Sequence, residues 1–346
     1  MEIHKELKDI SWLVDEPTYR ADPALSYSTL AKYEREGFDK LDHLFDHIST
    51  PSLTEGSAVD AIITGGEDEF NANFLVLDVN VTDGGKDTCQ QLLNMNLPYN
   101  MFEEIPEQIV SDAAKAAGFW ASDKWDKRRY AEVLKTGNVA EYYNAIKYSD
   151  KTIIDTDTYE KVLAMVRALR ESPATTGYFA DNDELSPIRR YYQLKFKATF
   201  EGVNYRIMAD DILVDYERKV IWPTDLKTSG KSEWNFEHSF LQWSYWIQSR
   251  LYWRVIKANL LKDDYFKDFT LMPYRFIVVN KVTLTPLVWE FPLTQSVGTL
   301  VDEDGNEYRD PFEIGKELQG YLNLRPPVPN GINKDGINII KCLSKK

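Results

Sequence analysis

The chain has 346 residues, of which 43% are hydrophobic and 13% aromatic, and its formal net charge is −14 at pH 7. A chain of this length can bury one large core or two modest ones. The acidic balance argues against a protein that coats nucleic acid, because phosphate binding usually brings a surplus of basic residues. It is compatible with an enzyme that gathers carboxylates around a divalent cation and concentrates its basic contacts in one groove.

Membrane and secreted classes are also disfavoured. No segment approaches the ~20 consecutive apolar residues of a membrane helix, and the first residues, MEIHKELKDISW, lack the apolar stretch of a secretory signal. The two cysteines, Cys89 and Cys342, are too few and too far apart for a disulfide framework or a cysteine-rich metal site. We therefore expect a soluble, cytosolic protein with two ordinary thiols.

Helices are predicted in the first half of the chain. Ser26 is typical of an N-cap, and the following AKYEREGFDKLDHLFD predicts a helix. The segment 54–63 predicts a second, short helix that ends at Gly65-Gly66 and has small residues on one side. A third helix is expected from residue 156 until Pro173 stops it.

The pattern changes to strands from residue 187. The stretches IRRYYQLKFKATF, NYRIMADDILVD and KVIWPTDLKT, separated by turn signals, predict an antiparallel meander of three strands. A long aromatic helix is expected over 233–261, and YRFIVVNKV and PLVWEFPL predict two further strands. This order indicates an α/β fold with a mixed central sheet flanked by helices.

The domain organisation expected from these elements is simple. We predict a single domain over residues 1–310, with a helical elaboration at about 75–150. Residues 311–346, with one more helix and the proline-rich RPPVPNG, are expected to form a C-terminal extension on the surface.

Three polar residues in the meander point to chemistry. Asp210 lies in MADDILV, an otherwise apolar strand, where an unpaired carboxylate would be costly to bury. Asp225 and Lys227 lie two apart near the end of the next strand, so both side chains point to one face. Two carboxylates on neighbouring strands can share Mg²⁺, and an ammonium beside them can orient a water or offset phosphate charge. Phosphodiester hydrolysis needs these functions.

The alternative is that an Asp-x-Lys on a strand is a solvated pair or a local salt bridge, which is the commoner case. Asp211 must face away from its neighbour Asp210, and both faces of the strand are apolar, so alternation does not decide which one serves the site. In the following helix, Gln248 and Tyr252 are four residues apart and share a face. An amide in so aromatic a helix should find a partner, such as a metal-bound water or a phosphate.

Together these residues resemble the PD-(D/E)XK nuclease superfamily. The pattern is Asp210, fourteen residues, Asp225-Leu226-Lys227, and then Gln248-x-x-x-Tyr252, which is the signature of the RecB-like branch. Within it the chain most resembles phage and prophage exonucleases of the exonuclease VIII (RecE) type. SYSTL, EGSAVDAII and RIMAD before the hairpin extend the resemblance to roughly residues 20–75 and 150–290.

The resemblance implies a PD-(D/E)XK core and a catalytic centre that uses Mg²⁺, or Mn²⁺ in its place. The implied roles are metal ligation by Asp210, Asp225 and the backbone carbonyl of Leu226, catalysis by Lys227, and support of the substrate end by Gln248 and Tyr252. Asp60 stands where many relatives have a metal-binding histidine. A carboxylate suits a hard cation, so we favour Asp60 as a ligand over a helix-surface residue in a site that has lost one. Two cysteines exclude the iron–sulfur branch.

Contacts with DNA are expected from basic residues near the motifs, although a solvated surface charge is the alternative for each. Arg206, on the strand of Asp210, is the preferred phosphate contact. The others are Lys195, Lys197, Lys231 and Arg250. The resemblance further implies 5′→3′ digestion of linear duplex DNA, a ring-like homo-oligomer and a single-strand annealing partner in phage-type recombination. A catalytically silent DNA-binding relative, and an endonuclease or packaging nuclease, remain alternatives.

Overall fold

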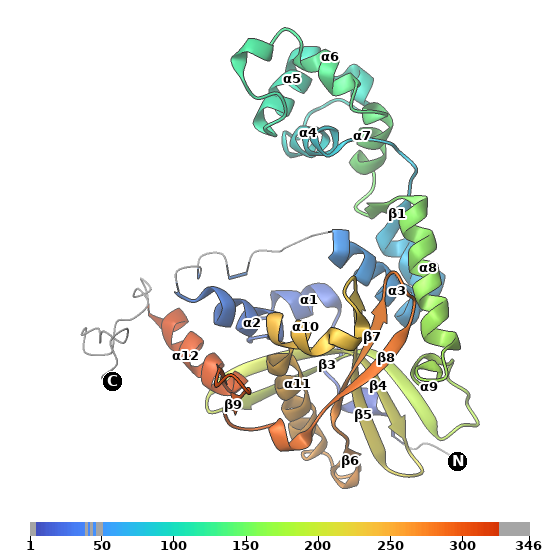
Figure 1. Cartoon of the computed structure of the whole chain (residues 1–346), viewed down its shortest axis with the longest axis vertical. Helices are drawn as coiled ribbons and strands as arrows, with labels where there is room; N and C mark the ends of the chain where they lie inside the picture. Colours follow the sequence, from blue (N-terminus) through green and yellow to red (C-terminus); the bar gives the residue numbers. More distant parts are fainter. Residues whose placement is uncertain (1–4, 39–40, 42–43, 46–50, 325–346) are drawn as a thin grey trace. The chain divides into compact units, whose positions relative to one another are not determined.

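The computed structural model describes residues 5–38, 41, 44–45 and 51–324, which form two compact units (Figure 1). The sheet unit lies within residues 1–56 and 165–346, and the helical unit spans residues 57–164. Each has a hydrophobic core of its own. The helical elaboration predicted at about 75–150 falls within the helical unit, and the single domain over 1–310 stays a prediction.

A six-stranded mixed sheet is the centre of the sheet unit. The strand order is β3 (Ile188–Phe200), β4 (Val203–Asp215), β5 (Val220–Ser229), β7 (Tyr274–Asn280) and β8 (Pro286–Phe291), with β6 (Thr270–Leu271) also pairing with β5. The meander β3-β4-β5 is antiparallel, as predicted, whereas β5 and β7 run parallel. The expected mixed α/β architecture, with helices flanking the sheet, is confirmed.

The β3–β4 hairpin is set by its turn. Phe200 pairs with Val203, so only Glu201 and Gly202 form the loop. Both have positive φ, 49° and 82°. A two-residue type I′ turn requires this conformation, and it fixes the register of the two longest strands.

Three helices cover one face of the sheet (Figure 1). They are α2 (Tyr27–Glu36), α11 (Tyr245–Leu260) and α12 (Pro311–Asn323), and α11 lies against β3, β4 and β7. Ser26 caps α2 as predicted, since its hydroxyl accepts the Thr29 N–H. Ile314 and Leu318 of α12 are fully buried. The predicted surface extension is therefore wrong as far as Asn323, and RPPVPNG lies outside the described residues.

The aromatic helix predicted over 233–261 is broken. It forms η5 (Glu233–Asn235), α10 (Phe236–Gln242) and then α11. Ser244, which is buried, adopts a left-handed backbone conformation with φ of 60° and separates α10 from α11. A non-glycine residue in this region signals a local constraint, and hydropathy alone does not reveal it.

The other face of the sheet is contacted by α9 (Thr176–Phe179), which follows α8 (Thr156–Glu171). Arg190 of β3 donates to the Gly177 carbonyl at 2.9 Å, and Arg275 of β7 donates to the Tyr178 hydroxyl at 2.7 Å. The remaining elements of the unit are η1 (Leu7–Ile10), α1 (Glu16–Ala21), η6 (Phe266–Asp268), η7 (Leu293–Gln295), β9 (Leu300–Val301) and β10 (Glu307–Tyr308).

The helical unit is entered through α3 (Pro51–Asn73), which is longer than predicted and bends at Gly66, where φ is 70°. Two short strands, β1 (Phe74–Val76) and β2 (Thr152–Ile154), pair in parallel. They come before and after the helices that form the core of this unit. Between them lie α4 (Asp83–Asn94), η3 (Phe102–Glu104), α5 (Glu107–Ala116), η4 (Asp123–Trp125), α6 (Arg129–Leu134) and α7 (Val139–Lys147).

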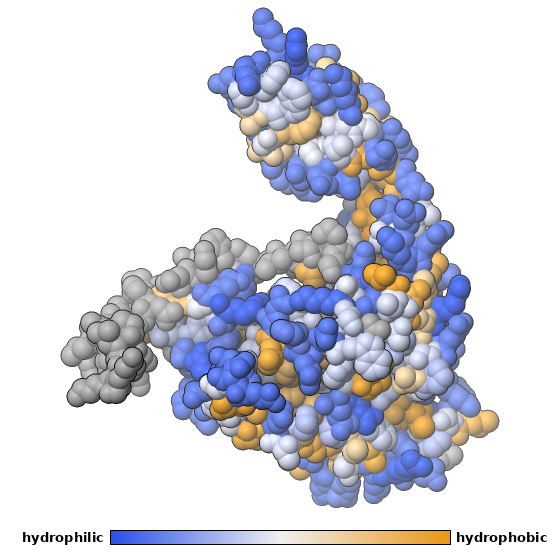
Figure 2. All heavy atoms as spheres, viewed as in Figure 1, coloured by the Kyte–Doolittle hydropathy of each residue, from blue (hydrophilic) through white to orange (hydrophobic). Residues whose placement is uncertain are grey.

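Hydrophilic residues dominate the visible surface, and hydrophobic residues are scattered over it (Figure 2). None of the helices in the described ranges combines the length and apolar character needed to cross a bilayer.

Candidate active site

Asp210 and Asp225 are brought together by the register of β4 and β5. The last paired residues are Asp211 and Thr224, and one further step along both strands sets Asp210 opposite Asp225. Residues opposite each other in an antiparallel pair point to the same face. The Leu226 N–H donates to Asp210 Oδ2 at 3.2 Å. A backbone donor of β5 therefore fixes the carboxylate of β4.

Lys227 lies beside these carboxylates on the same face. Its Nζ is 2.5 Å from Asp225 Oδ2 and 4.7 Å from the centroid of the Tyr245 ring. Burial lowers the pKa of Lys227, but the charges of Asp225 and Asp210 and the nearby phenols outweigh it, so the pKa is raised above its ordinary value. Lys227 is therefore an ammonium throughout the neutral range.

Gln248 completes the inner contacts of Asp225, which is 1% exposed. Its Nε2 donates to Asp225 Oδ1. The predicted partner of this amide, a metal-bound water or a phosphate, is replaced by a carboxylate. Two oxygens at this point, Gln248 Oε1 and Asp225 Oδ2, have no hydrogen-bond partner. The second of these still has the Lys227 ammonium at ion-pair distance, and we interpret the contact as an ion pair without hydrogen-bond geometry.

Phenols surround the carboxylates. Tyr252, one turn after Gln248 on α11, is buried and its ring contacts that of Tyr274 edge to face at 6.0 Å. Burial raises the pKa of both well above its ordinary value, and the charges of Asp210 and Asp225 raise it further. The Tyr274 hydroxyl has no partner. Sequence reasoning missed Tyr274 because its approach depends on the parallel pairing of β5 with β7.

Asp211 faces the opposite side of the sheet and belongs to a different environment. Its Oδ2 accepts the Thr224 hydroxyl at 2.8 Å, and its Oδ1 has no partner. Burial raises the pKa of Asp211 to about 7, which the Thr224 hydrogen bond partly offsets. Alternation does not choose between Asp210 and Asp211, and the motif favours Asp210. In the structure only Asp210 shares a face with Asp225 and Lys227.

The donor set suits a hard cation. Mg²⁺ binds proteins through one or two carboxylates and keeps several waters, and Asp210 and Asp225 offer such a pair. Among the described residues, no three His, Cys, Asp or Glu side chains gather into a metal-holding group. A cation here would complete its shell with water and substrate oxygens. Asp60 lies on α3 within the helical unit, and its ligand role, like that of the Leu226 carbonyl, stays a prediction.

Both arginines predicted to bind DNA, Arg206 and Arg250, are committed to the fold. Arg206 is buried, donates to the carbonyls of Ala24 and Tyr19, and lies 4.6 Å from the Tyr19 ring centroid. Arg250 is fully buried and donates to the carbonyls of Gln295 and Gly298, among others. Their guanidinium groups hold chain segments together, so the phosphate contacts expected of them are corrected to structural roles.

The three predicted lysines differ from one another. Lys197 pairs with Asp22 at 2.6 Å and lies over the Trp12 ring. Lys195 is half-buried and pairs in register with Met208, on the face that carries Asp210. Lys231 is exposed just after β5, and its Nζ donates to Gln242 Oε1 at 2.6 Å. Lys231 is thus the most available of the three for a phosphate.

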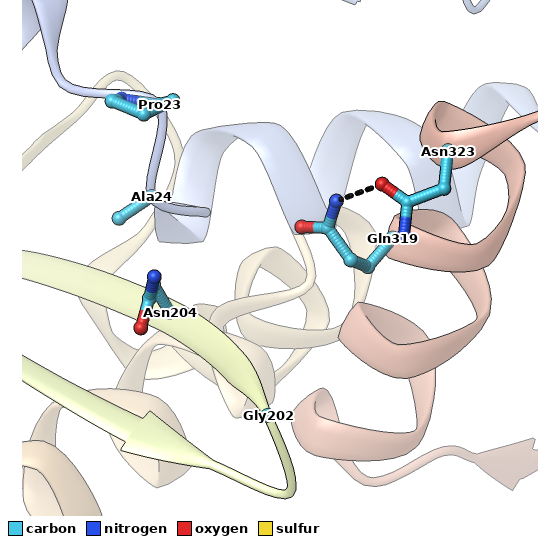
Figure 3. Close-up of a pocket in the computed structure, with 6 residues that line it drawn as sticks. All are labelled: Pro23, Ala24, Gly202, Asn204, Gln319 and Asn323. Carbon is cyan, nitrogen blue, oxygen red and sulfur yellow. Dashed lines mark hydrogen bonds between the residues drawn. The ribbon is translucent and has the colours of Figure 1, made fainter.

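A shallow hollow of about 320 Å³ lies elsewhere in the sheet unit. Its lining residues are Pro23, Ala24, Gly202, Asn204, Gln319 and Asn323 (Figure 3). None of them is charged, and Gln319 donates to Asn323 at 3.0 Å. It offers no carboxylate for a metal and no cation for a phosphate, so the carboxylate centre is the stronger candidate.

Comparison with protein-family models and with curated protein sequences finds no match. Among solved structures, the chain is similar to a crystal structure from Eubacterium rectale described as a "putative exonuclease". The TM-score is 0.43 and the identity 12%, with 82% of this chain and 80% of that chain covered. A likeness at this level says nothing about the activity of the chain.

Proposed function

We propose that the chain is a metal-dependent nuclease of the PD-(D/E)XK type that degrades linear duplex DNA from its ends. The observation that carries the proposal is the meeting of Asp210, Asp225 and Lys227 on one face of the sheet. The spacing of these residues, with Gln248 and Tyr252 behind them, resembles the RecE-type exonucleases. The 5′→3′ direction, a ring-like homo-oligomer, an annealing partner and a role in phage-type recombination are inferred from that resemblance alone.

The proposed cofactor is Mg²⁺, with Mn²⁺ able to replace it, held by Asp210 and Asp225. When bound, such a cation supplies Lewis acidity and lowers the pKa of a coordinated water. Both ligands are already oriented by the protein, Asp210 by the Leu226 N–H and Asp225 by Gln248. Orientation before binding reduces the ordering that the reaction itself requires.

Lys227 has a defined part in this chemistry. Because its pKa is raised, it is charged at neutral pH and acts as a hydrogen-bond donor rather than as a base. Its ammonium can hold the attacking water or a non-bridging phosphate oxygen and offset the charge that develops there. The proton of the water must therefore pass to solvent or substrate and not to Lys227.

The test uses the purified full-length chain with Mg²⁺ and two substrates, linear duplex DNA and closed circular duplex DNA. We expect loss of the linear form only, with Mn²⁺ also supporting the reaction. Asp225→Asn should remove the activity. Asp263→Asn, which alters an ion-paired carboxylate elsewhere in the sheet unit, should keep it.

Two other outcomes would identify an endonuclease or a catalytically silent DNA-binding protein. Nicking of the circular form would identify an endonuclease with the same centre. Absence of turnover with either cation, together with DNA binding that Asp225→Asn does not change, would identify a catalytically silent binder and overturn the enzyme proposal.

A further inference from the structure

Two exposed tryptophans flank α10 in the sheet unit. Trp234 is 69% exposed and Trp243 is 47% exposed, and all other tryptophans of the chain are buried or half-buried. Tryptophan is highly buried on average because its ring has a large apolar surface. Two such rings at the two ends of one short helix therefore call for a ligand with flat apolar faces.

The backbone of Trp243 lies near the candidate active site. The Trp243 carbonyl, freed by the break before α11, accepts the Tyr27 hydroxyl at 2.8 Å and Arg35 Nη1 at 3.3 Å. The ring centroids of Tyr27 and Tyr245 are 6.3 Å apart. The Lys227 ammonium lies over the Tyr245 ring. Only two aromatic rings thus separate Trp243 from the charged centre.

Two cations accompany the tryptophans. Arg35 is exposed on α2, and Lys231 is exposed in the loop that leads from β5 to Trp234. The loop is anchored, since Asn280 donates to the Lys231 carbonyl at 2.8 Å. Lys231 Nζ reaches Gln242, the neighbour of Trp243, at 2.6 Å. We call Arg35, Lys231, Trp234 and Trp243 the tryptophan rim.

The chemistry of the tryptophan rim selects one ligand. Aromatic side chains stack on nucleic-acid bases, each stack contributing about 1–3 kcal/mol, and cations along the strand neutralise its phosphates. Paired bases inside a duplex are already stacked on both sides, and a blunt end exposes only the outer face of its terminal pair. Two separate indole rings can therefore both stack on one strand only where that strand has unpaired bases. The positive charge of Arg35 and Lys231, in a chain of net charge −14, complements a phosphate backbone.

We propose that the tryptophan rim binds unpaired nucleotides of a DNA end and leads that strand to Asp225 and Lys227. The proposal rests on the nuclease function proposed above, and it adds the form of the substrate: an end with a single-stranded segment. A blunt duplex would have to lose its terminal pairs before its strand could engage both rings.

The test measures binding of the full-length chain to labelled DNA by fluorescence anisotropy, with Ca²⁺ in place of Mg²⁺ to suppress cleavage. The probes are one blunt hairpin duplex and the same duplex with a short tail, 5′ or 3′. We expect at least one tailed probe to bind about tenfold more tightly than the blunt one. Trp243→Ala and Trp234→Ala should each reduce that preference by roughly 5-fold or more, as the loss of one stacked base predicts.

Two controls keep the test specific. Trp243→Phe retains a stacking face and should keep most of the preference. Tyr148→Ala removes an exposed ring, 63% exposed, from the helical unit and should change nothing. Equal affinity for tailed and blunt DNA, or a preference that survives both tryptophan substitutions, would overturn the proposal. A change of oligomeric state in Trp243→Ala, measured by sedimentation, would do the same by identifying the rim as a self-interface.

The result is independent of catalysis. If Mg²⁺ supports no cleavage but the tail preference depends on Trp234 and Trp243, the nuclease proposal fails and the binding surface stands. If cleavage proceeds while the tail preference is absent, the nuclease proposal stands and the tryptophan rim is refuted.

Discussion

The two units of the chain differ in their buried polar groups. In the helical unit, each side-chain nitrogen of the buried Arg129 has an acceptor: it donates to the carbonyls of Trp120 and Ser122, to the Ser111 hydroxyl and to the Asp126 carboxylate. Within the described ranges, all buried side-chain nitrogen and oxygen atoms that lack a hydrogen-bond partner lie in the sheet unit. They belong to Asp211, Asp225, Trp246, Gln248, Tyr274 and Trp289.

The difference separates a structural role from a chemical one. A buried charge with every donor satisfied stabilises the fold around it, whereas an unsatisfied polar atom costs free energy that folding alone does not justify. Two of the unsatisfied residues, Asp225 and Gln248, meet beside Lys227 in the sheet unit. A third, Tyr274, is close enough for the charge of Asp225 to raise the pKa of its phenol. Natural proteins accept such violations mainly at functional sites.

The largest effect is expected from Lys227→Met. Removing the ammonium should lower the rate of DNA cleavage by about 10²–10³-fold, the usual cost of losing one charge-stabilising donor in an active site. Lys281→Met is the matched control, because Lys281 also forms a half-buried ion pair, with Glu55 at 2.6 Å. Cleavage rates of linear DNA should fall only in the first variant. Equal losses in both would show that ion pairing, and not position at the centre, determines activity.

A large change in stability is expected from Gly137→Ala in the helical unit. Gly137 has φ of 116°, and an added Cβ would lie 1.7 Å from the Asn80 carbonyl oxygen. The backbone must move, which should cost on the order of 3 kcal/mol or more. Hydrogen exchange should show faster opening of α4 to α7 with β3 to β5 unchanged.

Gly202→Ala is the control for backbone strain alone. Gly202 also has positive φ, 82°, but an added Cβ would meet nothing within 4 Å, so about 1 kcal/mol is expected. If Gly137→Ala accelerated exchange equally in both units, they would unfold as one body and the contrast between them would not hold energetically.

Local sequence patterns predicted much of the sheet unit. The meander follows from period-2 alternation and from turn chemistry at Glu201-Gly202, and these are properties of neighbouring residues. The pairing of Asp225 with Lys227 needed only the two-residue spacing within one strand. Gln248 was identified as a buried amide in need of a partner, because burial of a polar group in an aromatic helix can be inferred from its neighbours.

Contacts between distant segments could not be predicted in this way. Arg206 was expected to bind phosphate, but its partners are carbonyls about 180 residues earlier in the chain. The left-handed turn at Ser244 interrupts a segment whose residue types favour a continuous helix. Alternation could not choose between Asp210 and Asp211, because both faces of β4 are apolar, and only the spacing of the motif favoured Asp210.

A smaller effect is expected from Asp211→Asn in the sheet unit. Burial raises the pKa of Asp211 to about 7 in the folded state, above the unfolded value of about 3.9. The folded protein therefore binds the proton of the Asp211 carboxyl more tightly than the unfolded chain does. The contribution of this carboxyl to the free energy of unfolding falls as the pH rises from about 4 to 7. The amide cannot ionise, so Asp211→Asn should stabilise the protein by on the order of 2 kcal/mol at pH 8 and much less at pH 4.

Denaturant unfolding at the two pH values measures this difference. Asp215→Asn is the control on the same strand, because Asp215 accepts the N–H groups of Glu217 and Arg218 at 3.1 and 2.9 Å, and its loss should destabilise the protein. A destabilising Asp211→Asn at pH 8 would mean that the ionised carboxylate is needed, and that the unsatisfied oxygen has a partner in solution.

The smallest effect is expected from Cys89→Ala. Cys89 is fully buried in the core of the helical unit, where its thiol donates weakly to the Val139 carbonyl at 3.6 Å, and burial raises its pKa to about 12. Losing one sulfur from a packed core should cost about 1 kcal/mol, measured as faster hydrogen exchange in α4 and α7. Cleavage of linear DNA should stay within twofold of the unaltered chain. If it fell further, packing around Cys89 in the helical unit would affect Asp225 and Lys227, and the contrast between the two units would fail.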